Sequence, residues 1–459
     1  MKHLIHTLAA AALLASACQP APAPTTVHLQ GQLVDMGTTD VPMRYDGAAS
    51  LVGDSRDIIL HTDAEGRFDT VLPLTAPTYY SISRNTLYLT PGDDLTLRIT
   101  QDNRQAEFTG QGASVNTYMK GRLFPKGGSF LEGGSNLRPD FAGTKALVDS
   151  LAAVRRAQLD TLTGATDAFK RLEGARITAD VANSFLSYPS YAAMRGYLKM
   201  TPESLDSVYA TLKPDLVPLL RTLTDDELLD VAVVRDVLGS LATPYTPALE
   251  AIAGEVTLSP RARELYAAAG QVNRLRHRVD EAQLQAARAF ADSLTHTDFA
   301  DELRAKLNQA ARLLKGQPAI DFSFTDTEGK AHRLSDFRGK VLYLDFWATW
   351  CGPCIQESPH FEKLATRFKD ADVVFIPIST DTGREAWLSY LKAHDKQLPQ
   401  YNSTDEALRT GWSIHYIPRF VLIDRDFNIA DAYAPRPSQP EAAEALQGLL
   451  GNYQLSIVA

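Results

Sequence analysis

The chain has 459 residues, of which 44% are hydrophobic, so it is long enough to form two or three domains with sizeable cores. Its formal net charge is −9 and no stretch has the character of a basic nucleic-acid-binding face, which argues against a nucleic-acid partner. Its three cysteines, Cys18, Cys351 and Cys354, are too few for a disulfide scaffold or a four-cysteine zinc site, and we expect no metal.

Residues 1–17 have the layout of a signal peptide, with a positive charge at Lys2, an apolar stretch and small residues before Cys18. The apolar run is too short to span a bilayer. The segment resembles a bacterial lipobox, although Ala15 departs from the usual leucine, and this resemblance implies acylation of Cys18. Simple secretion is the alternative. Residues 18–26 then form an extended, proline-containing tether, so we expect a lipid-anchored protein of the cell envelope that faces the periplasm.

Residues 27–112 are predicted to be mostly strand. Val27 and Leu29 fall on one face of an alternating segment. Residues 58–68 and 87–97 each have the pattern of strand, turn and strand, with glycine or proline and glycine at the turn. We therefore predict a small antiparallel β-sandwich-like domain.

The next two segments differ in composition from this domain and from each other. Residues 113–143 are rich in glycine and are predicted to be an irregular connector. Residues 144–315 are rich in alanine, leucine and arginine, which favours an all-α middle region. This region contains no recognisable catalytic or binding motif, and its sequence is compatible with either a helical spacer or a docking module.

Four signals predict where helices of the middle region begin and end. Thr201 and Ser259 each place a capping hydroxyl directly before a proline, which suits the first turn of a helix. Thr224 and Glu227 have the spacing of a capping box, and the helix that follows should stop at Gly239.

From residue 316 to residue 459 the pattern alternates between strand and helix, which predicts an α/β domain with helices on the faces of a sheet. Strands are expected at 322–325, 341–348, 373–379, 420–424 and 428–433, and helices at 354–369, 384–394 and 441–450.

Two cysteines three residues apart, Cys351 and Cys354, lie between a predicted buried strand and a predicted helix. Backbone N–H groups and the dipole at a helix N-terminus favour the thiolate of the first cysteine, and the second can then displace a mixed disulfide. We therefore expect Cys351 to be the nucleophile and Cys354 the resolving thiol. A structural disulfide or half of a zinc site is the alternative, which the flanking strand and the lack of partner ligands disfavour.

Residues 316–455 resemble the thioredoxin fold, and specifically the TlpA/ResA type of exported thioredoxin-like disulfide reductases. The matching segments are Leu334–Val341, Phe346–Cys354 and Ile417-Pro418. The resemblance implies a protein-disulfide oxidoreductase that needs no cofactor beyond its dithiol. It also implies exported protein clients with disulfides, and re-reduction by a membrane thiol electron donor.

Two carboxylates near the motif are candidates for proton transfer. Asp345 interrupts an apolar strand, where burial of a carboxylate is costly. The resemblance places it behind Cys354, where burial would raise its pKa and let it accept the proton of that thiol. Glu357 lies on the same helix face as Cys354, and in ResA-like proteins a glutamate here faces the dithiol. The alternative is that Glu357 points to solvent.

Substrate contacts are expected around the dithiol. Pro418 matches the cis-proline of thioredoxins, which implies that the backbone of Ile417 lies alongside Cys351 and pairs with an incoming substrate strand. Arg419 departs from the threonine that usually follows, which leaves the substrate preference open. Trp350 is expected to shield the thiol and contact substrate, with core packing as the alternative.

Gly352 and Pro353 between the cysteines resemble reducing thioredoxins, so the leading prediction is a membrane-tethered reductase in which both residues line the substrate site. One alternative is an accessory or client-docking lipoprotein that carries a redox domain. A thiol peroxidase of the AhpC/TSA type is disfavoured, because Leu344 and Ala348 occupy the places where peroxidases have proline and threonine before the reactive cysteine.

Overall fold

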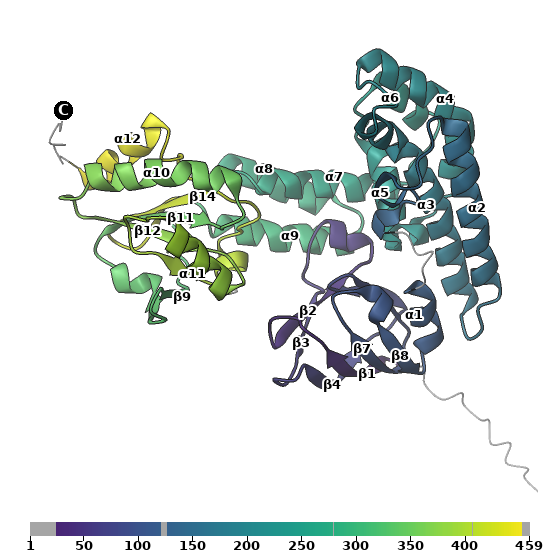
Figure 1. Ribbon diagram of the computed structural model, residues 1–459, viewed down its shortest axis with the longest axis horizontal. Coiled ribbons are helices and arrows are strands. Elements are labelled where there is room, and N and C mark those ends of the chain that lie inside the picture. The colour runs from purple at the N-terminus through teal and green to yellow at the C-terminus, as the bar shows by residue number, and fades with distance from the viewer. Residues whose placement is uncertain (1–23, 121–125, 279, 406, 452–459) are drawn as a thin grey trace, which may run out of the picture.

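The computed structural model describes residues 24–120, 126–278, 280–405 and 407–451, which form a β-rich part, a helical part and a C-terminal sheet domain in sequence order (Figure 1). This order confirms the predicted fold class. The predicted signal segment, Cys18 and most of the tether lie outside the described residues. Within the described ranges, no helix combines the length and the apolar character that a membrane span requires.

The β-rich part is a sandwich of two four-stranded sheets. Apolar side chains from both sheets, among them Leu29, Met43 and Leu97, form a single buried cluster between them. β1 pairs in parallel with β7, which departs from the predicted all-antiparallel arrangement. The first sheet has the order β4 (Arg67–Pro73), β1 (Thr26–Leu33), β7 (Asp94–Ile99), β8 (Glu107–Gly110), and the second has β3 (Ile58–His61), β2 (Asp40–Tyr45), β5 (Thr78–Ile82), β6 (Asn85–Leu89).

The two predicted strand–turn–strand segments are present, but neither is a hairpin. β3 and β4 belong to different sheets, as do β6 and β7. Each turn therefore carries the chain from one layer of the sandwich to the other, which lets consecutive strands bury their apolar faces against each other.

The described residues of the predicted connector, 113–120 and 126–143, have more regular structure than the sequence suggested. It contains helix α1 (Ala113–Met119), and its end belongs to helix α2. Phe130, Leu131 and Leu137 are buried against the helical core. These apolar residues anchor the glycine-rich turns, which explains why composition alone underestimated the order of the segment.

Eight helices, α2 to α9, form the described middle part, and their capping residues test the predicted boundaries. Thr201 and Ser259 cap α4 and α7 through their side chains, as predicted. The helices are α2 (Phe141–Asp160), α3 (Asp167–Met194), α4 (Pro202–Arg221), α5 (Ala232–Ala242), α6 (Pro247–Ala253), α7 (Pro260–Leu275), α8 (Glu281–Ser293) and α9 (Thr297–Ala311).

The other two boundary predictions were wrong. Thr224 caps no helix, because its hydroxyl donates to the carbonyl of Arg221 and Glu227 forms an ion pair with Arg171. Gly239 lies inside α5 and does not end it. A Cβ at this position would lie 3.2 Å from the ring of Tyr266 on α7, so the glycine serves close helix packing.

The C-terminal domain is a seven-stranded sheet covered by helices. β11 (Val341–Trp347) is central and fully buried, parallel to β12 and antiparallel to β14. The sheet order is β10 (Ala331–Arg333), β9 (Ser323–Asp326), β13 (Tyr401–Asn402), β12 (Val373–Ser379), β11, β14 (Arg419–Ile423), β15 (Ile429–Asp431), and the helices are α10 (Gly352–Arg367), α11 (Arg384–Ala393) and α12 (Pro440–Leu450).

Alternate residues of β11 point to opposite faces of the sheet. Val341 and Tyr343 pack with residues of α10 and α12. Leu342 and Leu344 belong to a separate cluster on the other face. Asp345 therefore points to the same side as α10, the helix that carries the cysteines.

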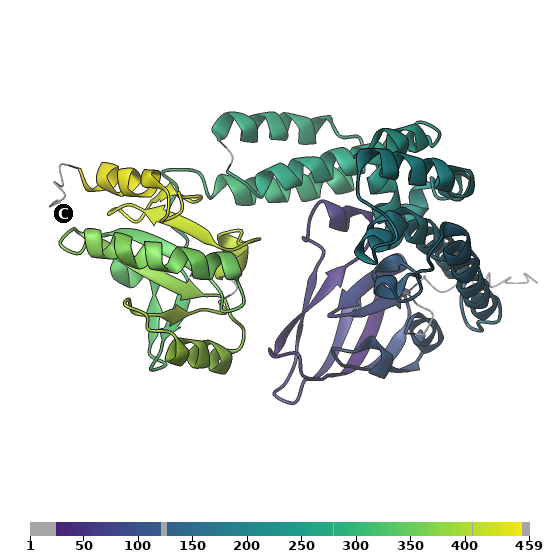
Figure 2. The same ribbon diagram turned by 45° about the horizontal axis from the view of Figure 1, so that its top comes forward.

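The helical part contacts both other parts. Figures 1 and 2 show α7, α8 and α9 between the C-terminal domain and the other helices. Toward the sandwich, Glu302 of α9 accepts a hydrogen bond from the hydroxyl of Ser55 at 2.6 Å. Toward the sheet domain, Arg278 donates to Asp431 and, at 2.7 Å, to the carbonyl of Tyr433.

Candidate active site

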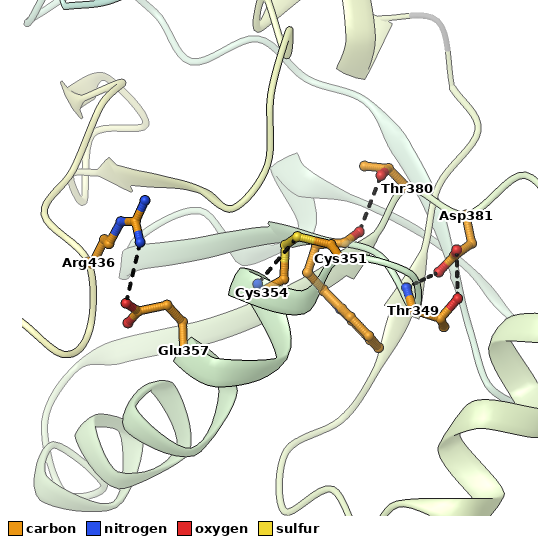
Figure 3. The surroundings of a disulfide bond; sticks show 8 residues. Thr349, Cys351, Cys354, Glu357, Thr380, Asp381 and Arg436 are labelled. Carbon is orange, nitrogen blue, oxygen red and sulfur yellow. Dashed lines mark hydrogen bonds and ion pairs between the residues drawn. A yellow bond between two sulfur atoms is a disulfide. The ribbon is translucent and has the colours of Figure 1, made fainter. Parts of the chain in front are cut away.

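Cys351 and Cys354 form a disulfide at the junction of β11 and α10 (Figure 3). Cys351 is the N-cap of α10, and its Sγ accepts a hydrogen bond from the backbone N–H of Cys354 at 3.3 Å. Pro353 occupies the first turn, where its missing N–H costs nothing. The helix N-terminus is thus directed at the sulfur of Cys351, as the sequence predicted.

Asp381 holds the loop that precedes Cys351. Its carboxylate accepts hydrogen bonds from the backbone N–H of Thr349 at 2.9 Å and from the hydroxyl of the same residue at 3.0 Å (Figure 3). Ser379 adds a further hydrogen bond at 2.7 Å. Sequence analysis missed Asp381, although its place just beyond the carboxyl end of a strand next to β11 was a signal that could have found it.

Asp345 is a buried carboxylic acid on the α10 side of the sheet. It is 4% exposed, and among the described residues its Oδ1 has no hydrogen-bond partner. Burial raises its pKa to about 8, the nearby charge of Glu357 adds to this rise, and the charge of Lys396 opposes it. At neutral pH the group therefore holds its proton but can exchange it.

Lys396 was not predicted to be part of the site. It is half-buried between α11 and β13, and its Nζ donates to the hydroxyl of Ser358 on α10 at 2.6 Å. Burial lowers the pKa of its ammonium group, while the carboxylates of Glu362 and Asp345 oppose this change. It is therefore a cation close enough to influence the ionisation of Asp345.

Glu357 is buried at 7% exposure and does not point to solvent. Its two oxygens accept hydrogen bonds from the backbone N–H of Ser438 at 3.1 Å and from the hydroxyl of Ser438 at 2.8 Å. Arg436 forms a longer ion pair with it at 3.8 Å (Figure 3). The carboxylate is thus fixed between α10 and the turn before α12, on the side of α10 that carries Cys354.

The predicted substrate residues surround the disulfide. The Ile417-Pro418 peptide bond is cis, and Ile417 packs against the cluster that contains both cysteines. Trp350 is 74% exposed beside Cys351, so core packing is not its role. Arg419, in contrast, is buried at 3% exposure at the start of β14.

Within the described ranges, no group of three or more histidine, cysteine, aspartate or glutamate side chains is arranged to hold a metal ion.

Comparison with known proteins identifies a matching family and several relatives. Residues 314–448 match the Redoxin family model. The chain is 31% identical to the thiol-disulfide oxidoreductase ResA of Bacillus thuringiensis subsp. konkukian over 133 residues, which cover 29% of this chain and 76% of that protein. It is 32% identical to the ResA of Bacillus cereus strain ZK / E33L over 116 residues, which cover 25% of this chain and 67% of that protein.

Among solved structures, a protein from Bacteroides vulgatus that bears the name of a thiol-disulfide oxidoreductase is 57% identical to the aligned part. The alignment covers 30% of this chain and 99% of that chain, with a TM-score of 0.30. The ResA matches, together with the Redoxin match that spans both cysteines, show that the chain belongs to the TlpA/ResA-type thioredoxin-like proteins and is a thiol-disulfide oxidoreductase.

Proposed function

We propose that the chain is an exported, lipid-anchored oxidoreductase that reduces disulfides of exported proteins through Cys351 and Cys354. The observation that carries the proposal is the combination of a helix-capping cysteine with a buried carboxyl group whose pKa is raised to about 8. A purely structural disulfide needs no proton acceptor behind it, whereas resolution of a mixed disulfide does.

In the first step, the Cys351 thiolate attacks one sulfur of a client disulfide. The client S–S bond breaks, a mixed disulfide forms, and the leaving client sulfur takes up a proton. The N-terminus of α10 stabilises the thiolate through its backbone N–H groups, as the hydrogen bond from Cys354 N–H to Cys351 Sγ illustrates.

In the second step, Cys354 loses its proton to the ionised form of Asp345 and attacks Sγ of Cys351. The bond between Cys351 and the client breaks, the client leaves as a thiolate that takes up a proton, and the Cys351–Cys354 disulfide forms. The client has then gained two electrons and two protons, and this chain is oxidised. A dithiol donor, which we place in the membrane, returns the chain to its reduced form by the same exchange chemistry.

The reduction potential of the Cys351–Cys354 pair tests whether the protein reduces or oxidises its clients. Gly352 and Pro353 resemble the sequence of reducing thioredoxins, for which the potential is about −270 mV, compared with about −120 mV for strong oxidants. A measured potential of the Cys351–Cys354 pair above roughly −150 mV contradicts the reductase assignment.

The anchor is a separate part of the proposal and rests on residues 1–17 and Cys18 alone. The mature protein made in a bacterial host should partition into detergent and carry an acyl-modified N-terminal cysteine. A Cys18→Ser variant should lose both properties. An aqueous wild-type product without lipid refutes the anchor and leaves the redox chemistry unaffected.

Trapping tests the client-directed activity. A Cys354→Ser variant cannot resolve its mixed disulfides, so it should accumulate exported proteins bound through Cys351, and mass spectrometry identifies them. A Cys351→Ser/Cys354→Ser variant is the matched control and should trap none. Equal recovery from both variants contradicts a role of Cys351 as nucleophile.

A further inference from the structure

A cleft of about 400 Å³ opens next to the substrate loop, and three arginines line it. Arg419 and Pro418 belong to the sheet domain, and Arg436 precedes α12. Arg278 comes from the turn between α7 and α8 of the helical part. The cleft therefore lies where two parts of the molecule meet, and one of its walls is the proline that adjoins the disulfide cluster.

Arg419 is the unusual member of the three. It is 3% exposed, its Nε donates to the carbonyl of Ala432 at 2.7 Å, and neither terminal nitrogen has a hydrogen-bond partner within the described ranges. The ring of Tyr433 lies 3.3 Å from the guanidinium carbon and covers one face of the group. An aromatic ring stabilises the face of a guanidinium but does not accept the N–H groups at its edge.

The other two arginines already have carboxylate partners, which limits what they contribute. Arg278 pairs with Asp431, and Arg436 pairs with Glu357 at 3.8 Å. Glu441 also lines the cleft and adds one negative charge. Among the described residues, Arg419 is thus a buried cation that forms no ion pair and whose two terminal nitrogens donate no hydrogen bond. Such a cation favours binding of an anion.

We propose that this cleft binds a carboxylate side chain of the client, close in sequence to the cysteine that Cys351 attacks. The inference rests on the proposed function and adds a substrate class to it. A planar carboxylate can accept two parallel hydrogen bonds from the two terminal nitrogens of a guanidinium, and this is the donor pair that Arg419 leaves open. The ring of Tyr416, 41% exposed and centred 5.7 Å from the guanidinium carbon, also lines the cleft.

The position of the cleft explains why the ligand is part of the client. Pro418 is both a wall of the cleft and the neighbour of Ile417, which packs against the cysteines. An extended peptide advances about 3.3 Å per residue, so a strand held beside Ile417 reaches the cleft within a few residues of its cysteine.

Residues of the helical part also contribute to the proposed binding of the client carboxylate. Besides the contacts of Arg278, the ring of His277 lies 6.0 Å from that of Tyr416, and the hydroxyl of Tyr433 donates to the carbonyl of Leu275 at 3.5 Å. The turn after α7 thus completes the cleft and holds its aromatic residues. Residues outside the sheet domain are therefore specificity-determining for the client.

The experiment compares two synthetic peptides that share one disulfide and differ by a glutamate or a glutamine within four residues of the cysteine. In a single reaction cycle, the full-length reduced protein should reduce the glutamate peptide with a second-order rate constant about tenfold or more above that for the glutamine peptide, and the protein should end as the Cys351–Cys354 disulfide. Arg419→Gln should bring this ratio near one, and Arg278→Gln should lower it. Arg274→Gln removes an exposed charge of α7 that does not line the cleft, and it should keep the wild-type ratio.

Two further measurements distinguish failure of the cleft proposal from misfolding of a variant and from failure of the proposed function. Arg278 is an exposed residue, so its variant tests the cleft even where Arg419→Gln fails to fold. Binding of the same peptides with alanine in place of cysteine needs no redox chemistry. Wild type and Arg274→Gln should bind the glutamate form more tightly than the glutamine form, and Arg419→Gln should not. Equal turnover and equal binding of the two peptides overturn the inference. Tighter binding of the glutamate form without turnover of either peptide overturns the proposed function and keeps the cleft.

Discussion

Ser438 donates hydrogen bonds to both carboxylate oxygens of Glu357, at 3.1 Å from its backbone N–H and at 2.8 Å from its hydroxyl. This contact fixes a negative charge on α10 on the inner side of the helix. Lys396 places a positive charge against the same helix through Ser358. The charge of Glu357 raises the pKa of Asp345, and the charge of Lys396 lowers it. Removing one of the two charges should therefore shift this pKa, in a direction that depends on which charge is removed.

Asp345→Asn should slow the resolution of mixed disulfides at neutral pH. The amide cannot accept the Cys354 proton, and a positioned general base typically contributes about 10²–10⁴-fold. Stopped-flow release of a fluorescent client peptide from the Cys351 adduct measures this step. Asp370→Asn, which changes an exposed carboxylate beyond the end of α10, is the control. Wild-type rates in Asp345→Asn exclude Asp345 as the base.

Lys396→Met should move the pH dependence of resolution upward. In the wild type, the rate should rise with pH through about 8, as Asp345 ionises. Removing the ammonium group takes away the charge that favours the ionised form, so the midpoint should shift to higher pH and the rate at neutral pH should fall. Lys392→Met removes an exposed charge from α11 and should leave the midpoint unchanged. A midpoint that stays in place in Lys396→Met shows that the two groups are not coupled.

Glu357→Gln should have the opposite effect. The charge of Glu357 raises the pKa of Asp345, so its loss should lower the midpoint of the same profile and accelerate resolution below pH 8. Glu444→Gln, on the exposed side of α12, is the matched control. If the midpoint of the profile shifts to higher pH in Glu357→Gln, the charge of Glu357 does not act on Asp345 as assigned. Loss of the hydrogen bonds of Glu357 alone predicts no direction for this shift.

The oxidised protein should lose stability as the pH rises from about 4 to about 8, because the folded state holds the proton of Asp345 over a range in which the unfolded state has released it. The slope contributed by one such group is at most about 1.4 kcal/mol per pH unit. Asp345→Asn should remove this slope and be more stable than wild type above pH 8.

Tryptophan fluorescence during urea denaturation measures this effect in the full chain. All four tryptophans, Trp347, Trp350, Trp387 and Trp412, belong to the sheet domain, so the signal reports on the unfolding of that domain alone. A wild-type midpoint that does not change between about pH 5 and about pH 9 contradicts a raised pKa for Asp345.

Local signals predicted the elements well where the residues that form them are close in sequence. Thr201 and Ser259 cap their helices because a hydroxyl and the N–H groups it accepts from lie within one turn. Thr224 has the same local pattern but fails, since Glu227 is held by Arg171 on another helix. Gly239 lies inside its helix and not at its end, and it is a glycine because the ring of Tyr266 leaves little room for a side chain. In both cases a tertiary contact decided the outcome.

The same division applies to the site. Asp345 and Glu357 could be found because each lies at a fixed spacing from the cysteines along one strand or helix. Asp381 and Lys396 reach the site from later segments, and Arg278 from a different part of the chain, so no local motif marks them. Only the topology of the sheet brings Asp381 and Lys396 to the active site, and only the packing of the helical part brings Arg278 to the cleft beside it.

Helix α9 joins the sandwich to the sheet domain through contacts from its middle and its C-terminal part. Glu302 and Lys306 bind Ser55 and Asp54, and Gln309 donates to the carbonyl of Thr410. A helix of 15 residues is about 22 Å long and does not bend easily. The helix therefore fixes the sandwich at a set distance and orientation from the domain that carries the disulfide.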